Sequence, residues 1–256
     1  MIPIYKPYFK KYKIHFLTFG GGNKSFHDAV KRLTDQAYNF NIFNKIHGFT
    51  DLDLKNDKDF WNTHSQFILQ NPRFYGYAIW KSYLIKKVMN EINDNDILLY
   101  LDCGCELNIN GKKRFEDYID IVKYHDSLAF QIEHKEKSYT KSDLLIKINE
   151  EYKNTGQIES GMIFLKKTDI NIKLVSEWYN LMISQNYHLI DDSPSIISND
   201  ITFVEHRHDQ SCFSLLMKKY NRFVIPDETY FHPNWNIGIN YPIWAIRNKT
   251  GNSIFN

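Results

Sequence analysis

The chain has 256 residues, a length that suits one or two domains and buries enough surface to fold without disulfides or a structural metal. Hydrophobic residues at 43% and charged residues at 24% are globular values, which exclude a disordered or fibrous protein. The formal net charge of +2 is too balanced for a dedicated nucleic-acid-binding protein. Three cysteines, Cys103, Cys105 and Cys212, are too few for a closed disulfide framework and favour a reducing, cytoplasmic location.

No repeat, linker or long block of one charge divides the sequence. We therefore expect a single domain at 13–240, between an N-terminal tail at 1–12 and a C-terminal tail at 241–256. No run of about 18 apolar residues occurs, so no integral membrane segment is expected. The first ten residues are interrupted by Pro and Lys, so they are not expected to form a signal peptide. Their basic and aromatic side chains suit a solvated tail or, as the alternative, peripheral contact with an anionic membrane.

Apolar runs and helical periodicity alternate along the chain. In order, we expect a strand at 14–18, a helix capped by Ser25 and running through Leu33, helices at 60–68 and 79–92, a strand at 97–101, a helix at 114–123, strands at 127–132 and 161–165, and helices at 170–183 and 210–220. The stretch 191–205 is expected to be a loop. This alternation predicts an α/β fold with a mixed, mainly parallel sheet that helices cover on both faces.

The most informative segment is the apolar run 97–101 with the residues after it, Asp102, Gly104 and Glu106. Ligands of open α/β sheets bind outside the carboxyl ends of the strands. A carboxylate there, beside a glycine that permits close approach, suits a divalent cation that bridges two phosphates. A structural interpretation, with Asp102 capping a turn and Glu106 in solvent, stays open. Cys103 and Cys105 lack a second Cys pair for a zinc site and are expected to be buried fillers.

The densest polar cluster is the run His206, Arg207, His208 and Asp209, which precedes an amphipathic helix. Asp209 suits either a helix N-cap or a base that takes the proton of a hydroxyl group. The neighbouring histidines and arginine exceed what a cap requires, so the base is favoured. The same cluster suits a metal-dependent hydrolase, although no second compact group of ligands accompanies it.

These motifs, in this order, resemble a GT-A-type nucleotide-sugar-dependent glycosyltransferase. The resemblance covers about residues 13–235 and rests on the segments 16–20, 76–85, 95–106, 158–164 and 206–211. It implies a GT-A-like (Rossmann-like) fold and a hexosyltransferase-like enzyme of glycan biosynthesis. Such an enzyme moves a sugar from a nucleoside diphosphate sugar, with a UDP-sugar favoured, to a hydroxyl of a glycan or other acceptor. A non-catalytic carbohydrate-binding protein is an alternative that leaves the Asp102 motif unexplained.

The resemblance also implies a metal site. The family's motif is Asp-x-Asp, and here Gly104 occupies the place of the second Asp. The expected ligands of Mn²⁺ or Mg²⁺ are therefore Asp102, Glu106 and a late histidine, His232. Binding of the metal through Asp102 and water only stays open. An enzyme that works without a metal is the alternative.

Further residues are expected to bind the substrates or act in the reaction. Those expected at the donor are Thr18, Phe19, Gly20, Trp80, Lys81, Asp102, Gly104, Ser160 and Gly161. Trp80 and Lys81 are adjacent and cannot share a helix face, so we expect one to pack and the other to reach a phosphate. Asp209, with His208 beside it, is expected to act as the base, and Glu159 to position the substrate.

Overall fold

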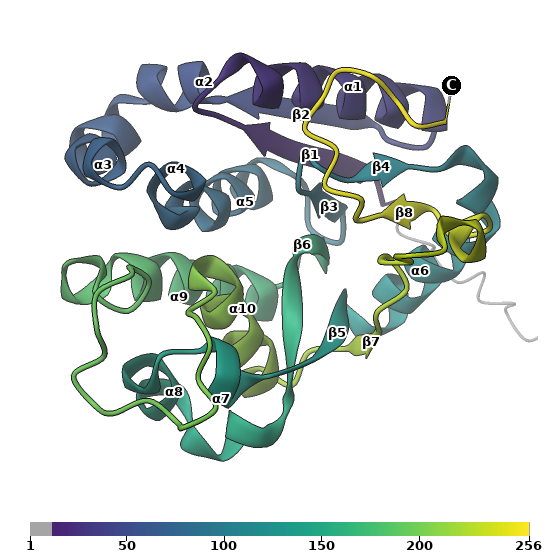
Figure 1. Cartoon of the computed structure of the whole chain (residues 1–256). Helices are drawn as coiled ribbons and strands as arrows, with labels where there is room; N and C mark the ends of the chain where they lie inside the picture. Colours follow the sequence, from purple (N-terminus) through teal and green to yellow (C-terminus); the bar gives the residue numbers. More distant parts are fainter. Residues whose placement is uncertain (1–11, 256) are drawn as a thin grey trace, which may run out of the picture.

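The structure is a computed structural model that describes residues 12–255, so the predicted N-terminal tail lies almost wholly outside the described residues. A six-stranded sheet with the order β2-β1-β3-β6-β5-β7 forms its centre (Figure 1). Its strands are β1 (Ile14–Gly20), β2 (Lys45–Thr50), β3 (Ile97–Leu101), β5 (Ser127–Lys135), β6 (Gly156–Lys166) and β7 (Val224–Pro226). Only β6 runs antiparallel to its neighbours, which confirms the predicted mixed, mainly parallel sheet.

Ten α-helices lie in the described part of the chain. They are α1 (Lys24–Phe40), α2 (Asp51–Asn56), α3 (Lys58–Gln70), α4 (Phe74–Tyr77), α5 (Ile79–Glu91), α6 (Lys112–His125), α7 (Glu136–Tyr139), α8 (Ser142–Ile148), α9 (Asp169–Ile183) and α10 (His208–Lys219). No helix in the described range is long and apolar enough to cross a membrane.

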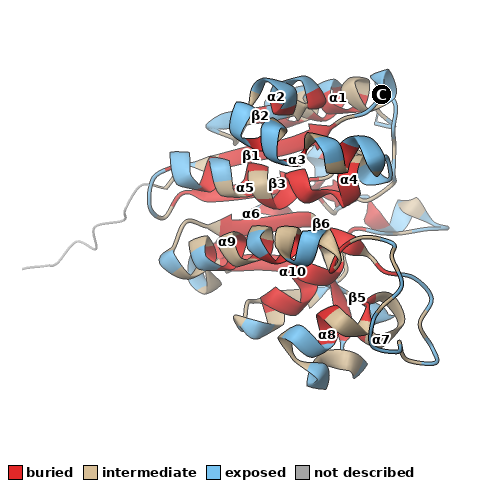
Figure 2. Cartoon of the chain, turned by 90° about the vertical axis from the view of Figure 1, so that its left-hand side faces the viewer, coloured by how far each residue is buried: buried red, intermediate tan, exposed pale blue. Residues whose placement is uncertain are grey.

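Helices cover both faces of the sheet, as predicted. Leu98 and Tyr100 of β3 pack with α5, α9 and α10 in one hydrophobic cluster, whereas Leu99 and Leu101 pack with α1 and α6 in a second. All five residues of β3 are buried, as expected for a central strand covered on both faces. Figure 2 shows the sheet as a buried layer, with the exposed residues concentrated on the outer sides of the helices and in loops.

Two expected helix caps are wrong, Ser25 and Asp209. Helix α1 begins at Lys24, and its N-cap is Asn23, whose side chain accepts a hydrogen bond from the backbone of Phe26. Helix α10 begins at His208, so Asp209 lies inside the first turn and is not the cap. A carboxylate in that turn is still favoured by the positive end of the helix dipole.

The C-terminal segment crosses the front of the sheet (Figure 1). Strand β8 (Ile243–Trp244) pairs with β4 (Glu106–Leu107), directly after the Asp102 segment. The backbone N–H of Asn248 then donates a hydrogen bond of 2.8 Å to the carbonyl of Gly104. Residues 243–248, which the sequence predicts to be part of a tail, therefore lie against the segment that carries the predicted metal motif.

The strand order reverses between β1 and β3. From β1 the chain passes through α1 to β2 on one side, and then through α2–α5 to β3 on the other side of β1. Ligands of such sheets bind in the crevice outside the carboxyl ends of the strands at this point. In this chain those ends are Gly20 and Leu101, and the residue after Leu101 is Asp102.

Candidate functional site

The centre of the candidate site is the ammonium group of Lys81, on the first turn of α5. Its Nζ atom lies 2.7 Å from Oδ2 of Asp209 and 3.1 Å from Oδ1 of Asp102. It also donates to the carbonyl and hydroxyl oxygens of Ser160, at 3.2 and 3.3 Å. The Lys81 side chain is only 4% exposed. Burial lowers its pKa, but the carboxylates of Asp102 and Asp209 raise it more, so the net pKa lies above the ordinary value.

Asp102 is the part of this cluster that faces solvent, with 46% of its side chain exposed. Its Oδ1 atom accepts a hydrogen bond of 2.5 Å from the hydroxyl of Tyr100, besides the ion pair with Lys81. Its backbone N–H donates to the carbonyl of Gly161. A Cβ atom at Gly161 would lie 3.2 Å from Oδ2 of Asp102, so glycine keeps this oxygen open to a ligand. The sequence analysis did not identify Tyr100, although residues two apart on a strand share a face.

Asp209 belongs to the same cluster but is far less accessible, with 11% of its side chain exposed. Its Oδ2 atom accepts a hydrogen bond of 2.7 Å from the hydroxyl of Ser160, in addition to the ion pair with Lys81. The structure thus brings together four of the predicted residues: Lys81 of α5, Asp102 directly after β3, Ser160 of β6 and Asp209 of α10.

A left-handed turn places Lys81. Residues 74–78 all have positive φ angles, and only one of them is glycine. Left-handed backbone costs about 1–2 kcal/mol per residue for the others, and such strain concentrates at functional sites. The indole N–H of Trp80 donates to the carbonyl of Phe74 and closes the turn against α5. The prediction that one of Trp80 and Lys81 packs is confirmed, but both side chains are buried, and Lys81 reaches carboxylates within the protein.

The predicted residues of β1 play different parts. Phe19 stacks on Trp80 with 4.0 Å between ring centroids. Thr18 is fully buried, so its side chain is not accessible to a nucleotide. Gly20 allows the close approach of α1, because a Cβ there would lie 2.5 Å from the carbonyl oxygen of Phe26. These residues therefore pack the end of β1 against α1 and α5.

Glu106 does not join Asp102. It is completely buried and forms an ion pair of 2.8 Å with Arg32. It also accepts hydrogen bonds from Gln36, Asn248 and Ser253, which occupy both carboxylate oxygens. This carboxylate ties α1 to the C-terminal segment and has no free oxygen for a metal. The expected ligand role of Glu106 does not fit this placement.

The other parts of the predicted metal site do not assemble either. His232 is exposed and its ring stacks near Tyr230. Gly104 lies under the C-terminal segment, where a Cβ would meet the Cα of Arg247 at 3.3 Å. Within residues 12–255, no three His, Cys, Asp or Glu side chains are placed to bind one metal ion. Asp102 is therefore the only one of the three predicted ligands with an accessible carboxylate in the crevice.

The two histidines of the 206–209 run are structural in their contacts. His206 is buried; its Nε2 atom bonds the carbonyl of Leu189, and its Nδ1 atom accepts from the backbone of Lys141. His208 is 2% exposed and bonds the carbonyl of Ile190. Burial lowers the pKa of both rings, which keeps them neutral. This arrangement does not support a hydrolase metal site, and it does not bring His208 to the Lys81 cluster.

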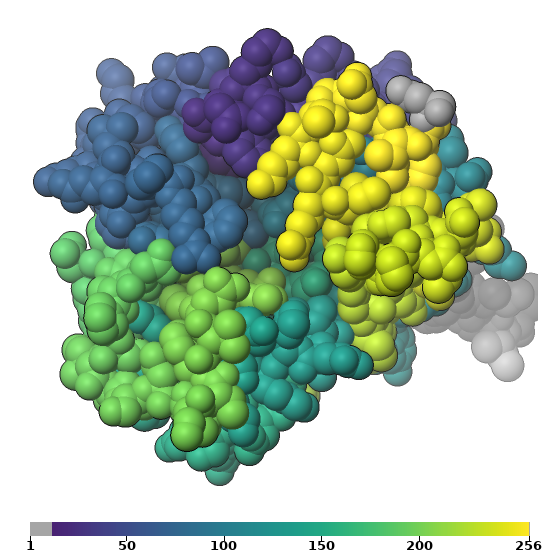
Figure 3. Space-filling model, in the orientation of Figure 1, coloured from purple at the N-terminus to yellow at the C-terminus, as the bar shows by residue number. Residues whose placement is uncertain are grey.

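The space-filling view shows the surface hollowed where the blue N-terminal part, the green part and the yellow C-terminal segment meet (Figure 3).

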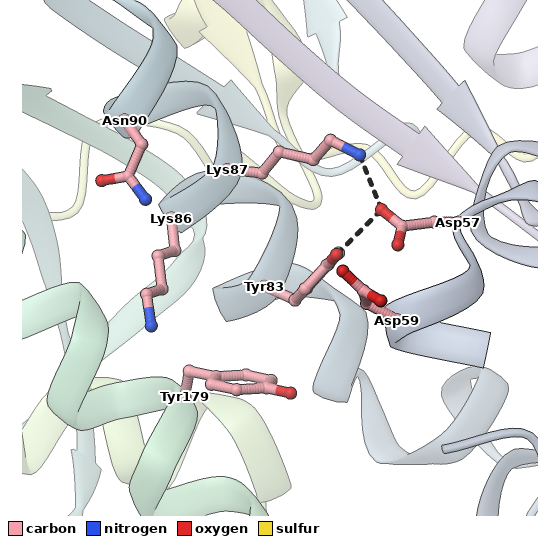
Figure 4. A pocket seen from close by; sticks show the side chains of 7 residues that line it. All are labelled: Asp57, Asp59, Tyr83, Lys86, Lys87, Asn90 and Tyr179. Atoms are coloured by element: carbon pink, nitrogen blue, oxygen red, sulfur yellow. Dashed lines mark hydrogen bonds and ion pairs between the residues drawn. The ribbon is translucent and has the colours of Figure 1, made fainter. Parts of the chain in front are cut away.

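A separate surface pocket of about 440 Å³ lies between α3, α5 and α9, lined by Asp57, Asp59, Tyr83, Lys86, Lys87, Asn90 and Tyr179 (Figure 4). In it, Lys87 and Tyr83 both bind Asp57. None of its residues belongs to the Lys81 cluster, so we do not assign it to the candidate site.

Comparison with solved structures gives distant neighbours. No protein-family model matches the sequence, and no curated protein matches it. A solved glycosyltransferase involved in the glycosylation of the major capsid of PBCV-1 aligns over 91% of both chains, with 10% identity and a TM-score of 0.49. Mouse xyloside xylosyltransferase 1 aligns over 91% of this chain and 97% of its own, with 10% identity and a TM-score of 0.46. The function proposed below therefore rests on the residues of the site.

Proposed function

We propose that this chain is a glycosyltransferase that moves a sugar from a nucleoside diphosphate sugar to a hydroxyl acceptor. The observation that carries the proposal is the Lys81 cluster, which presents one accessible carboxylate, Asp102, at the reversal point of strand order. Ligands of open α/β sheets bind there. Because Gly161 has no Cβ to crowd Oδ2 of Asp102, a sugar ring can approach this carboxylate.

The donor is proposed to lie across the carboxyl ends of β1 and β3. The glycines after β1 lead into α1, whose first backbone N–H groups and dipole favour a phosphate. Arg247 is exposed on the segment that covers Gly104 and adds a positive charge near the site. The free Oδ2 atom of Asp102 is then available to accept a hydrogen bond from a sugar hydroxyl.

The reaction breaks the bond between the anomeric carbon and the diphosphate, and a bond to the acceptor oxygen replaces it. Lys81 is buried and acts as a positioning residue, because its ammonium fixes the carboxylates of Asp102 and Asp209 and the hydroxyl of Ser160. The described residues do not provide the three-ligand metal site that the sequence predicts, so the proposal assigns no step to a metal.

A nucleotide screen followed by a transfer assay tests the proposal. A ligand that binds only the folded state raises the melting temperature, so UDP or GDP at saturating concentration should raise that of this chain. With the matching sugar donor and a panel of glycan acceptors, the product should gain one sugar and the nucleoside diphosphate should be released.

Asp102→Asn should abolish transfer without unfolding the chain, and Asp94→Asn in an exposed turn serves as the matched control. Binding of free sugars with no effect of any nucleotide would overturn the proposal and favour a carbohydrate-binding protein.

A further inference from the structure

A second charged group borders the cleft on β6, next to the Lys81 cluster. Glu159 directly precedes Ser160, whose hydroxyl bonds Lys81 and Asp209, in a part of β6 where the register with β5 shifts. Gly161 is the residue that borders the accessible oxygen of Asp102. Glu159 is therefore two residues along the strand from the place where the donor sugar is proposed to lie.

Glu159 is half-buried, and within residues 12–255 its carboxyl group has no hydrogen-bond or ion-pair partner. This separates it from the other acidic side chains of the site. Asp102 is bonded to Tyr100 and Lys81, and Asp209 to Ser160 and Lys81. A carboxyl group that nothing holds is free to exchange a proton with a bound molecule.

Four charged groups from different elements act on the ionisation of Glu159. Asp102 follows β3, Asp227 follows β7, Arg207 precedes α10, and Arg247 lies in the segment after β8. Burial raises the pKa of Glu159 most, the charges of Asp227 and Asp102 raise it further, and the two arginines lower it, for a pKa of about 8. A base works best when its pKa is near the working pH.

We infer that Glu159 is the catalytic base that accepts the proton of the acceptor hydroxyl. The acceptor O–H bond breaks and its proton moves to the Glu159 carboxylate, while the acceptor oxygen forms a bond to the anomeric carbon. The bond between that carbon and the diphosphate breaks, and its electron pair leaves with the diphosphate. The Oδ2 atom of Asp209, the residue that the sequence analysis favours for this role, is already bonded to Lys81 and Ser160. The inference rests on the proposed glycosyl transfer.

The first test compares Glu159→Gln with Glu133→Gln, an exposed glutamate on the neighbouring strand β5. Removing a positioned base typically costs ~10²–10⁴-fold in rate, so kcat of Glu159→Gln should fall by at least about 10²-fold while nucleotide affinity stays parental. Glu133→Gln should keep the parental rate. A parental kcat for Glu159→Gln in an active enzyme would overturn the inference and leave the proposed function standing. No transfer by the parent would instead reject the proposed function.

The second test uses the pH dependence of kcat/KM, which does not require a variant at Glu159 itself. Glu159 must be deprotonated to accept a proton, so kcat/KM of the parent should rise as the pH increases through about 8. Asp227→Asn removes a charge that raises the pKa of Glu159, so the rise of kcat/KM should move to lower pH. Arg247→Gln removes a charge that lowers the pKa of Glu159, so the rise of kcat/KM should move to higher pH. Shifts in the same direction, or none, would contradict the assignment.

Discussion

The Nζ atom of Lys81 lies 2.7 Å from Oδ2 of Asp209, and this ion pair joins the first turn of α5 to the first turn of α10. The two residues are 128 positions apart in the sequence. Both side chains are largely withdrawn from water, at 4% and 11% exposure. A charge pair in such a place is costly to break, because the remaining charge has neither water nor a partner.

Lys81→Met should therefore destabilise the fold strongly. It leaves the Asp209 carboxylate buried without a counter-charge, and breaking a buried pair costs about 3–5 kcal/mol of the free energy of unfolding. Lys87→Met is the matched control, since its ion pair with Asp57 involves a lysine that is 42% exposed. Surface pairs contribute about 0–1 kcal/mol, so the control should lose little. Urea unfolding of both variants measures the difference.

The double variant Lys81→Met with Asp209→Asn separates charge from packing. Asp209→Asn neutralises a carboxylate that Lys81→Met leaves unpaired, so the double variant should lose less stability than the sum of the two single variants. Strictly additive losses would show that the charges of Lys81 and Asp209 are not coupled.

A prediction on metal dependence follows from the placement of Glu106 and His232. Because neither joins Asp102, binding of a nucleoside diphosphate should not require a divalent cation. The rise in melting temperature with UDP or GDP should be the same in EDTA and in manganese chloride. A rise that needs Mn²⁺ and disappears in Asp102→Asn would instead support the metal role that the sequence predicts for Asp102.

Much of the central sheet is visible in the sequence, because its central elements have strong periodicity. Strand β3 spans the predicted residues 97–101, and α5 ends one residue before its predicted end at 92. Strand β2 was not predicted because its segment alternates weakly and contains Gly48. The short helix α8 and the three-residue strand β7 are likewise too brief to show a period.

The site is only partly visible in the sequence, since its contacts join distant positions. Asp102 stands out because it follows an apolar strand, and the Lys81–Asp209 pair joins two separately predicted motifs. Glu106 pairs with Arg32 because α1 packs against β4, and no local sequence pattern predicts this packing. The role of the C-terminal segment depends on β8, whose two residues give no strand signal of their own.

Glu106→Gln should act on stability rather than on the nucleotide site. Glu106 is fully buried, and Arg32, at 2% exposure, depends on it for charge compensation. Losing that charge should cost about 3 kcal/mol of the free energy of unfolding, the lower end for breaking a buried pair. Below the unfolding temperature, the affinity for UDP or GDP should stay parental. A loss of nucleotide affinity in a variant of parental stability would return Glu106 to the metal site.

The loss of folding stability at acidic pH should depend on His64 of α3. Its ring is completely buried, with Nδ1 bonded to the hydroxyl of Tyr187 and Nε2 to that of Tyr179. Burial lowers the pKa of His64 to about 4, from an ordinary value of 6.5. Between these values the unfolded chain binds a proton that the folded chain does not. Protonation of His64 in the unfolded chain therefore does not reduce the free energy of unfolding above pH 6.5. It reduces that free energy progressively as the pH falls from 6.5 to about 4.

His64→Gln removes this titration, and the slope of stability against pH is the measurement. One pKa unit corresponds to about 1.4 kcal/mol, so the parent should lose about 3 kcal/mol more than the variant between pH 6.5 and 4. The glutamine variant is expected to be less stable at pH 7 as well, since it loses one of the two tyrosine contacts, but its curve should be flatter. His232→Gln, at an exposed position, should keep the parental slope. Parallel curves for the parent and His64→Gln would show that His64 is not the group that limits stability in acid.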